Sequence, residues 1–218
     1  DFRYYKQLDP TGRCVFERRV HKFIRLKDFE GREGLVITRE MEVLVAASAI
    51  QITFGLPSVY LDRFQTVILY PDVYYSTITK VYHHGEVNTA GVIVLSWKSL
   101  VQGYLNPYDG RNLGLHEMAH ALKISDATSR PGFDFLDEEA LHDFIFYARE
   151  EMQLIVNGKG GFFRQYASSN DHEFFAVAIE NFFERPVDFQ DFHPQMYKSV
   201  VRLLNHNTLN GVRLKTPQ

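Results

Sequence analysis

The segment from His116 to His120 reads His-Glu-Met-Ala-His, and apolar residues flank it on both sides. Two histidines four residues apart lie on one face of an α-helix, where both can reach a single metal ion. Glu117 projects about 100° away from the first histidine on such a helix, so it can meet a water on the metal rather than the metal itself. A helix this apolar must be buried, and its polar side chains then need partners. The segment therefore predicts a buried, metal-binding helix.

The alternative is a chance motif whose two histidines hydrogen-bond to backbone carbonyls. Two imidazoles and a carboxylate inside an apolar helix are costly unless a metal or hydrogen bonds compensate them, which favours the metal. The single cysteine, Cys14, cannot form an internal disulfide, so a metal site in this chain must use histidine and carboxylate ligands.

A catalytic zinc takes three protein ligands and keeps one position open for water, so a further ligand must come from later in the chain. A predicted helix at residues 171–184 carries Glu173 and Glu180 on one stripe among phenylalanines and alanines. They are two turns apart, about 10.5 Å along the axis, so one can bind the metal and the other can only support it. Spacing does not choose between them, because Glu180 followed by Glu184 also resembles the acidic arrangement of gluzincins.

Strand-like segments precede most of the helical segments. Runs of β-branched and aromatic residues predict strands at residues 66–70, 73–81 and 92–97. Apolar periodicity predicts helices at residues 14–24, 38–55, 112–122, 136–156, 171–184 and 191–205. Strands grouped before helices, without a βαβ rhythm, favour an α+β domain with a small mixed or antiparallel sheet.

We expect residues 1–33 to form an N-terminal helical extension packed on a catalytic domain at residues 34–218. Hydrophobic residues make up 45% of the chain, which is enough for a substantial core. A net charge of -3 gives no electrostatic basis for binding nucleic acid, and no apolar run approaches the roughly 18 residues of a membrane span. We expect a cytoplasmic protein, although a segment before Asp1 could carry an anchor.

Four segments resemble the Mlc titration factor A family of zinc-dependent peptidases: residues 70–72 (Tyr-Pro-Asp), 94–97 (Val-Leu-Ser-Trp), 109–112 (Asp-Gly-Arg-Asn, before the metal motif) and 166–184. The resemblance covers about residues 34–186. It implies a zincin-like metallopeptidase domain, related to the catalytic domain of anthrax lethal factor, with a helical half that carries both the motif helix and the helix of the third ligand.

The resemblance also implies roles for single residues. It makes Glu173 the third zinc ligand, leaves Glu180 to support the ligands, and makes Tyr166 a hydrogen-bond donor to the oxyanion; the alternative for Tyr166 is a buried structural tyrosine. One departure is Lys123, which stands where the family commonly has an acid. Asp126 lies close by and could replace that acid, but we interpret it as an exposed loop residue.

These features predict a zinc peptidase that hydrolyses peptide bonds with a metal-activated water, for which Glu117 is the general base. The resemblance implies that the enzyme is an aminopeptidase acting on short peptides. The strand at residues 92–96 could bind a peptide substrate along its edge, or could instead be a central strand. His83 and His84, in a predicted turn, are interpreted as solvated. The rival function is a regulatory protein that sequesters a transcriptional repressor, with the zinc site mainly structural.

Overall fold

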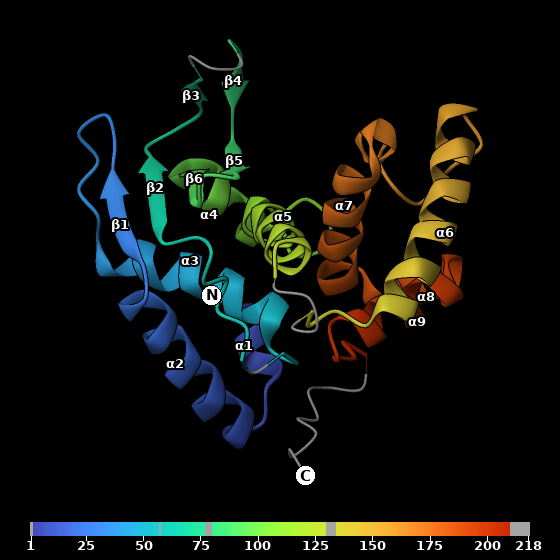
Figure 1. The fold of residues 1–218 in the computed structure, drawn as a ribbon, viewed down its shortest axis with the longest axis horizontal. Helices are drawn as coiled ribbons and strands as arrows, with labels where there is room; N and C mark the ends of the chain where they lie inside the picture. Colours follow the sequence, from blue (N-terminus) through green and yellow to red (C-terminus); the bar gives the residue numbers. More distant parts are fainter. Residues whose placement is uncertain (1, 57, 77–79, 130–133, 210–218) are drawn as a thin grey trace.

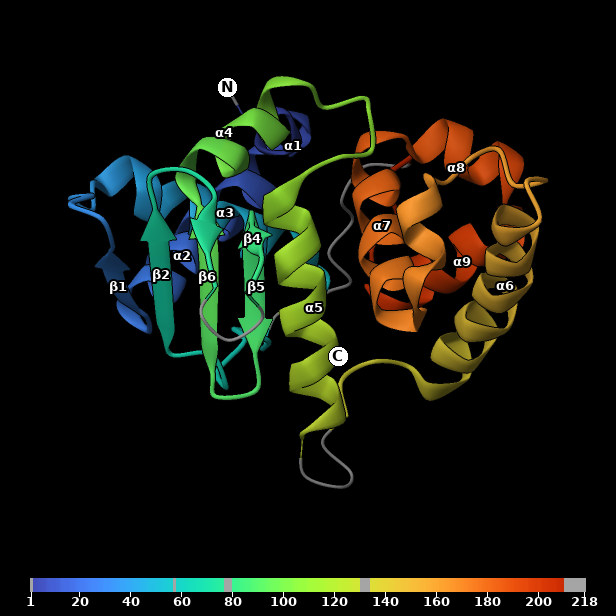
Figure 2. The ribbon, with the colours of Figure 1, turned by 90° about the horizontal axis from the view of Figure 1, so that it is seen from above.

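The computed structural model describes residues 2–56, 58–76, 80–129 and 134–209. It shows a mixed α+β fold, with a small sheet and its helices on one side and a group of helices on the other (Figures 1 and 2). Helix α5 (Leu113–Ala127), which contains the His-Glu-Met-Ala-His motif, lies between these two parts and packs against both. The predicted α+β class with a small mixed sheet is thus confirmed.

Four strands form the main sheet, in the order β1 (Asp28–Gly31), β2 (Thr66–Tyr70), β6 (Val92–Ser96) and β5 (Gly85–Asn88). The pairs β1–β2 and β2–β6 are parallel, whereas β5 runs antiparallel to β6. Strand β1 was not predicted, because the sequence Asp-Phe-Glu-Gly contains no β-branched residue. It brings the segment at residues 1–33 into the sheet, while the division of the chain at residue 33 stays a prediction.

Strand β6 is paired on both edges, to β2 and to β5. The prediction that this strand binds a peptide substrate along its edge is therefore wrong. Its apolar side chains explain its central place, since Ile93 and Leu95 are fully buried. The end strand next to α5 is β5.

A second, two-stranded sheet pairs β3 (Tyr74–Tyr75) with β4 (Tyr82–His83). The strand predicted at residues 73–81 is therefore much shorter in the described part of the chain, and its residues 77–79 lie outside that part. His83 belongs to a strand rather than to a turn.

Helices α2 (Pro10–Arg25) and α3 (Arg39–Thr53) pack on each other beside the sheet (Figure 1). Helix α3 begins where the sequence predicts, because the Thr38 hydroxyl accepts a hydrogen bond from the Met41 backbone N–H. Two helices on this side were not predicted: α1 (Arg3–Gln7) and α4 (Trp97–Leu105), which follows β6 directly.

The helices of the other part are α6 (Glu138–Val156), α7 (Asp171–Glu184), α8 (Pro186–Phe192) and α9 (Pro194–Leu203), with a short 3-10 helix η1 (Gln165–Ser169) before α7. Helix α7 has the predicted bounds. The helix predicted at residues 191–205 is shorter, because Pro194 starts a new helix and α8 precedes it. None of the helices in the described residues is both long and apolar enough to cross a membrane.

Candidate metal centre

Helix α5 is held in place at its N-terminus by a buried asparagine. The Asn112 side-chain oxygen accepts from the Leu115 backbone N–H at 3.1 Å, and its amide group donates to the Gly103 carbonyl and to Glu184, each at 3.1 Å. These contacts fix the start of the helix against α4 and α7, so the motif residues one turn later are fixed as well. His116 and Glu117 are buried, with 8% and 5% of their surface exposed.

Three side chains from two helices converge at the centre of the molecule. The Nε2 atoms of His116 and His120 lie 3.2 Å apart, and the Glu173 carboxylate is 3.1 Å from the first and 3.6 Å from the second. Two nitrogens bound tetrahedrally to one zinc at about 2.1 Å would be separated by about 3.4 Å. The ligand atoms of this set all lie within 4.8 Å of one another, so the three residues fit a single divalent metal.

The carboxylates around the two imidazoles favour a positive charge at this site. Burial alone would lower the pKa of His116, but hydrogen bonds to Glu173 and Glu180 outweigh burial and raise it to about 10. Burial would likewise raise the pKa of Glu173, yet its hydrogen bonds to His116 and His120 hold it well below the ordinary value. A metal ion supplies the positive charge that this acidic environment stabilises.

Glu180 holds His116 from the side opposite the proposed metal position. Its carboxylate, 1% exposed, accepts from His116 Nδ1 at 2.5 Å and from the two terminal nitrogens of Arg164 at 2.5 and 2.9 Å. Arg164 also donates to the Gly110 carbonyl at 2.6 Å. A carboxylate on Nδ1 sets the ring orientation and leaves Nε2 free to bind a metal. Glu180 lies about two turns from Glu173 along α7, and its carboxylate contacts the Nδ1 side of the His116 ring and Arg164.

Glu117 faces a cavity of about 790 Å³ that is also lined by His116, by Tyr166 and by Gly85, the first residue of β5. Burial raises the pKa of Glu117, partly offset by the two neighbouring histidines. The carboxylate lies directly against Gly85, the first residue of β5: a Cβ at that glycine would be 2.7 Å from the Glu117 side chain. Glycine is needed here because the strand and the carboxylate approach so closely.

Tyr166 lies in η1 with its ring 6.1 Å from that of His116, and 51% of its surface is exposed. The alternative of a buried structural tyrosine is therefore wrong. The pKa of the Tyr166 hydroxyl is raised to about 12, because part of the side chain is buried and because the Glu173 carboxylate lies nearby. The hydroxyl therefore remains a proton donor at neutral pH. It lines the same cavity as Glu117.

A family model described as glucose-regulated metallo-peptidase M90 matches residues 1–204. The chain belongs to the M90 metallopeptidase family. It is similar to uncharacterized protein slr2042 of Synechocystis (30% identity; 89% of this chain, 77% of the relative). It is also similar to two proteins named Mlc titration factor A. The one from Edwardsiella ictaluri is 28% identical over 87% of this chain and 78% of the relative, and the one from Yersinia pestis strain Pestoides F is 26% identical over 89% of this chain and 77% of the relative. The resemblance to that family is confirmed, and membership implies a divalent metal.

The structure places Lys123, the departure from the family pattern, and corrects the interpretation of Asp126. Lys123 donates to the carbonyl of Asp171 at 3.3 Å, so it joins the C-terminal part of α5 to the first turn of α7. Asp126 is buried rather than exposed, and lies in α5 rather than in a loop; its carboxylate accepts from the backbone N–H groups of Phe135 and Leu136, both at 3.0 Å. Asp126 therefore anchors residues 135 and 136, just before α6, and its side chain is engaged there.

Sequence reasoning missed the supporting role of Arg164 and the place of His84. The buried carboxylate of Glu180 demanded a cationic partner, but nothing in the spacing named Arg164, which lies in an irregular connection. His84 lines the cavity next to Glu117, and its Nδ1 is 2.8 Å from the Ser99 hydroxyl. Both His83 and His84 line this M90 cavity; His84 is exposed, as its interpretation as solvated requires, whereas His83 is half-buried.

Proposed function

We propose that this M90 metallopeptidase is a zinc-dependent, zincin-like peptidase whose metal is held by His116, His120 and Glu173. The observation that carries the proposal is the convergence of these three ligand atoms beside the buried carboxylate of Glu117, which faces the same cavity. Bound zinc supplies a Lewis acid that lowers the pKa of water toward about 7 and polarises the scissile carbonyl. Three protein ligands leave a coordination position for that chemistry.

In this proposal Glu117 is the general base. Its raised pKa suits a group that takes a proton from the attacking water and then delivers it to the leaving amine. The Tyr166 hydroxyl, protonated at neutral pH, donates to the oxyanion of the tetrahedral intermediate. Glu180 acts on the reaction only through His116, by keeping the ring in the tautomer whose Nε2 lone pair faces the metal.

For the substrate we propose short peptides cleaved from their free N-terminus. The cavity volume of about 790 Å³ suits a short peptide rather than a folded chain, and the preference for a free N-terminus rests on the family resemblance. Matched peptides with free and acetylated N-termini test this directly: an aminopeptidase cleaves only the free form. Equal cleavage of both forms would instead establish an endopeptidase at the same metal centre.

The second candidate is a regulatory protein that sequesters a transcriptional repressor. It is favoured by the name Mlc titration factor A that two of the relatives carry. The two functions make different demands on Glu117, because a purely structural metal needs no buried base beside its ligands. Repressor capture that survives in a variant without peptidase activity would support the regulatory function as a separate property.

The experiment that tests the metal centre measures bound metals and hydrolysis together. We expect purified wild-type protein to contain zinc, to cleave a mixed peptide library, and to lose cleavage with a chelator and recover it with added zinc. His120→Ala should lose both zinc and cleavage. Cleavage that persists in chelator-treated, zinc-free protein would refute the proposal.

A further inference from the structure

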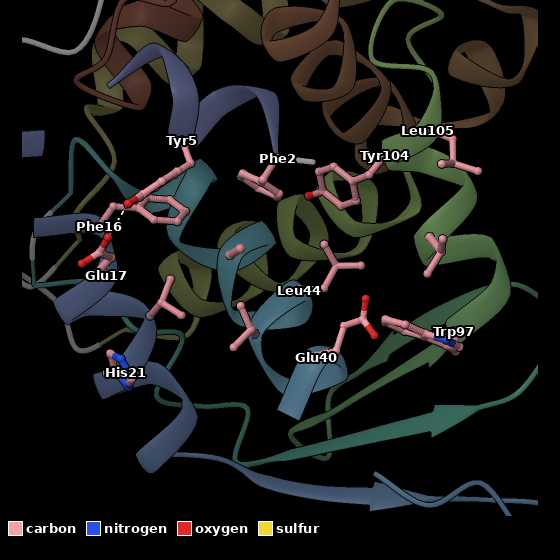
Figure 3. Close-up of a pocket in the computed structure, with 14 residues that line it drawn as sticks. Phe2, Tyr5, Phe16, Glu17, His21, Glu40, Leu44, Trp97, Tyr104 and Leu105 are labelled. Carbon is pink, nitrogen blue, oxygen red and sulfur yellow. Dashed lines mark hydrogen bonds between the residues drawn. The ribbon is translucent and has the colours of Figure 1, made fainter. Parts of the chain in front are cut away.

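A second cavity, of about 470 Å³, lies between α2, α3 and α4, away from the metal ligands. Figure 3 shows its aromatic rings, with Tyr5 and Phe16 on one side and Tyr104 and Trp97 on the other. Helix α3 forms the floor between them and contributes Leu44. We call this cavity the α3–α4 pocket. Its volume and its aromatic, aliphatic lining are those of a small-molecule site.

Helix α4 separates the α3–α4 pocket from the cavity of the metal centre. Trp97, Val101 and Leu105 line the α3–α4 pocket, whereas Ser99 and Gln102 line the cavity that contains Glu117 and Tyr166. The two sets of residues alternate along one helix, so they point to its opposite sides. None of the three proposed metal ligands lines the α3–α4 pocket. A ligand bound there therefore does not occupy the substrate position.

The charged residues that line the α3–α4 pocket are acidic. They are Glu17 and Glu40, and neither Lys nor Arg is among the lining residues. The lining histidine, His21, has its Nδ1 3.2 Å from the guanidinium of Arg39. Glu17 accepts a hydrogen bond from the hydroxyl of Tyr5. Within the described part of the chain, Glu40 forms no ion pair, and its carboxylate lies between Leu44 and Trp97 (Figure 3).

We propose that the α3–α4 pocket binds a small organic cation with an apolar body, such as an alkyl or arylalkyl amine. The apolar body would lie among the aromatic side chains, where burial of each CH₂ contributes about 0.8 kcal/mol according to transfer data. The ammonium group would lie near Glu40 and over the face of Trp97, which combines a carboxylate with a cation–π contact. An acid of the same shape meets two carboxylates and is repelled.

The chain contains a single tryptophan, Trp97, so emission excited at a wavelength that tyrosine does not absorb reports on a residue of this pocket. Titration with octylamine, 1-octanol and octanoate varies the head group on one apolar body. We expect saturable changes in fluorescence, with octylamine binding about tenfold more tightly than octanoate. Equal affinity for the three compounds, or no saturable change with octylamine, would overturn the proposal.

Variants separate the pocket from other amine sites. Glu40→Gln should remove most of the preference for octylamine over octanol, whereas Glu42→Gln, in the same turn of α3 but outside the pocket lining, should keep it. His116→Ala should leave octylamine binding unchanged, because the amine does not bind at the metal centre. Loss of binding in His116→Ala, or an unchanged preference in Glu40→Gln, would contradict the assignment; neither result depends on peptidase activity.

Discussion

Replacing Glu180 by Gln tests how the metal ligands are oriented. The carboxylate is buried and accepts three hydrogen bonds, one from His116 and two from Arg164. The Glu180→Gln variant keeps the shape but removes the charge, and it turns one acceptor into a donor that faces Arg164 or the imidazole N–H. Loss of such a supporting carboxylate typically lowers metal affinity about 10–100-fold, or roughly 1.4–2.7 kcal/mol.

The assay is a competitive zinc titration against a chelating dye, combined with urea denaturation. The matched control is Glu184→Gln, which changes a second buried carboxylate on α7 that bonds Asn112 instead of a histidine. Burial raises the pKa of Glu184 to about 7, so a neutral amide resembles a form that this group already populates. The glutamine side-chain oxygen can still accept from the Asn112 amide and so keep the contact that holds the start of α5, and we therefore expect the control to bind zinc as the wild type does. A folded Glu180→Gln variant with wild-type zinc affinity would refute the role of Glu180 in orienting His116.

Three further predictions concern the proposed oxyanion donor Tyr166, the glycine of β5 beside Glu117, and the dependence of stability on pH. Tyr166→Phe should keep zinc and lower kcat about 10²–10³-fold in steady-state assays, and a change in KM alone would argue against an oxyanion donor. Gly85→Ala, whose Cβ would lie 2.7 Å from Glu117, should reduce hydrolysis more than zinc content; unchanged activity would show that the strand can shift. Burial lowers the pKa of His206 to about 4, so the unfolded chain binds a proton at higher pH than the folded protein does. Stability to urea should therefore fall by up to about 3 kcal/mol as pH falls from about 6.5 to about 4, and this fall should be smaller in His206→Phe; equal pH slopes would contradict it.

The helices of the metal centre could be predicted because their sequences are strongly apolar and have clear start signals. Helix α7 has the predicted bounds, and its N-terminus is capped by Asn170, whose side chain accepts from the backbone N–H groups of residues 172 and 173. The motif spacing also identified the two histidines and Glu117 as a set. The choice of Glu173 over Glu180 came only from the family resemblance, since both lie on one stripe.

Other features depend on long-range contacts that periodicity does not encode. Strand β1 is polar and short, and it is a strand because its backbone pairs with β2. Backbone pairing also decides the place of β6: its apolar sequence is consistent with a central strand, but only its pairing with both β2 and β5 establishes that place. Arg164 is 16 residues from Glu180 in sequence, and only the fold brings the two together.

The most direct test of the account is the Glu117→Gln variant, measured for zinc and for peptide hydrolysis in the same preparation. The amide keeps the size of the side chain against Gly85 but cannot take a proton from water. We predict zinc content equal to the wild type and hydrolysis lowered about 10²–10⁴-fold, while Glu184→Gln retains activity. A zinc-loaded Glu117→Gln protein with full peptidase activity would contradict the central claim that Glu117 is the base of this metal centre.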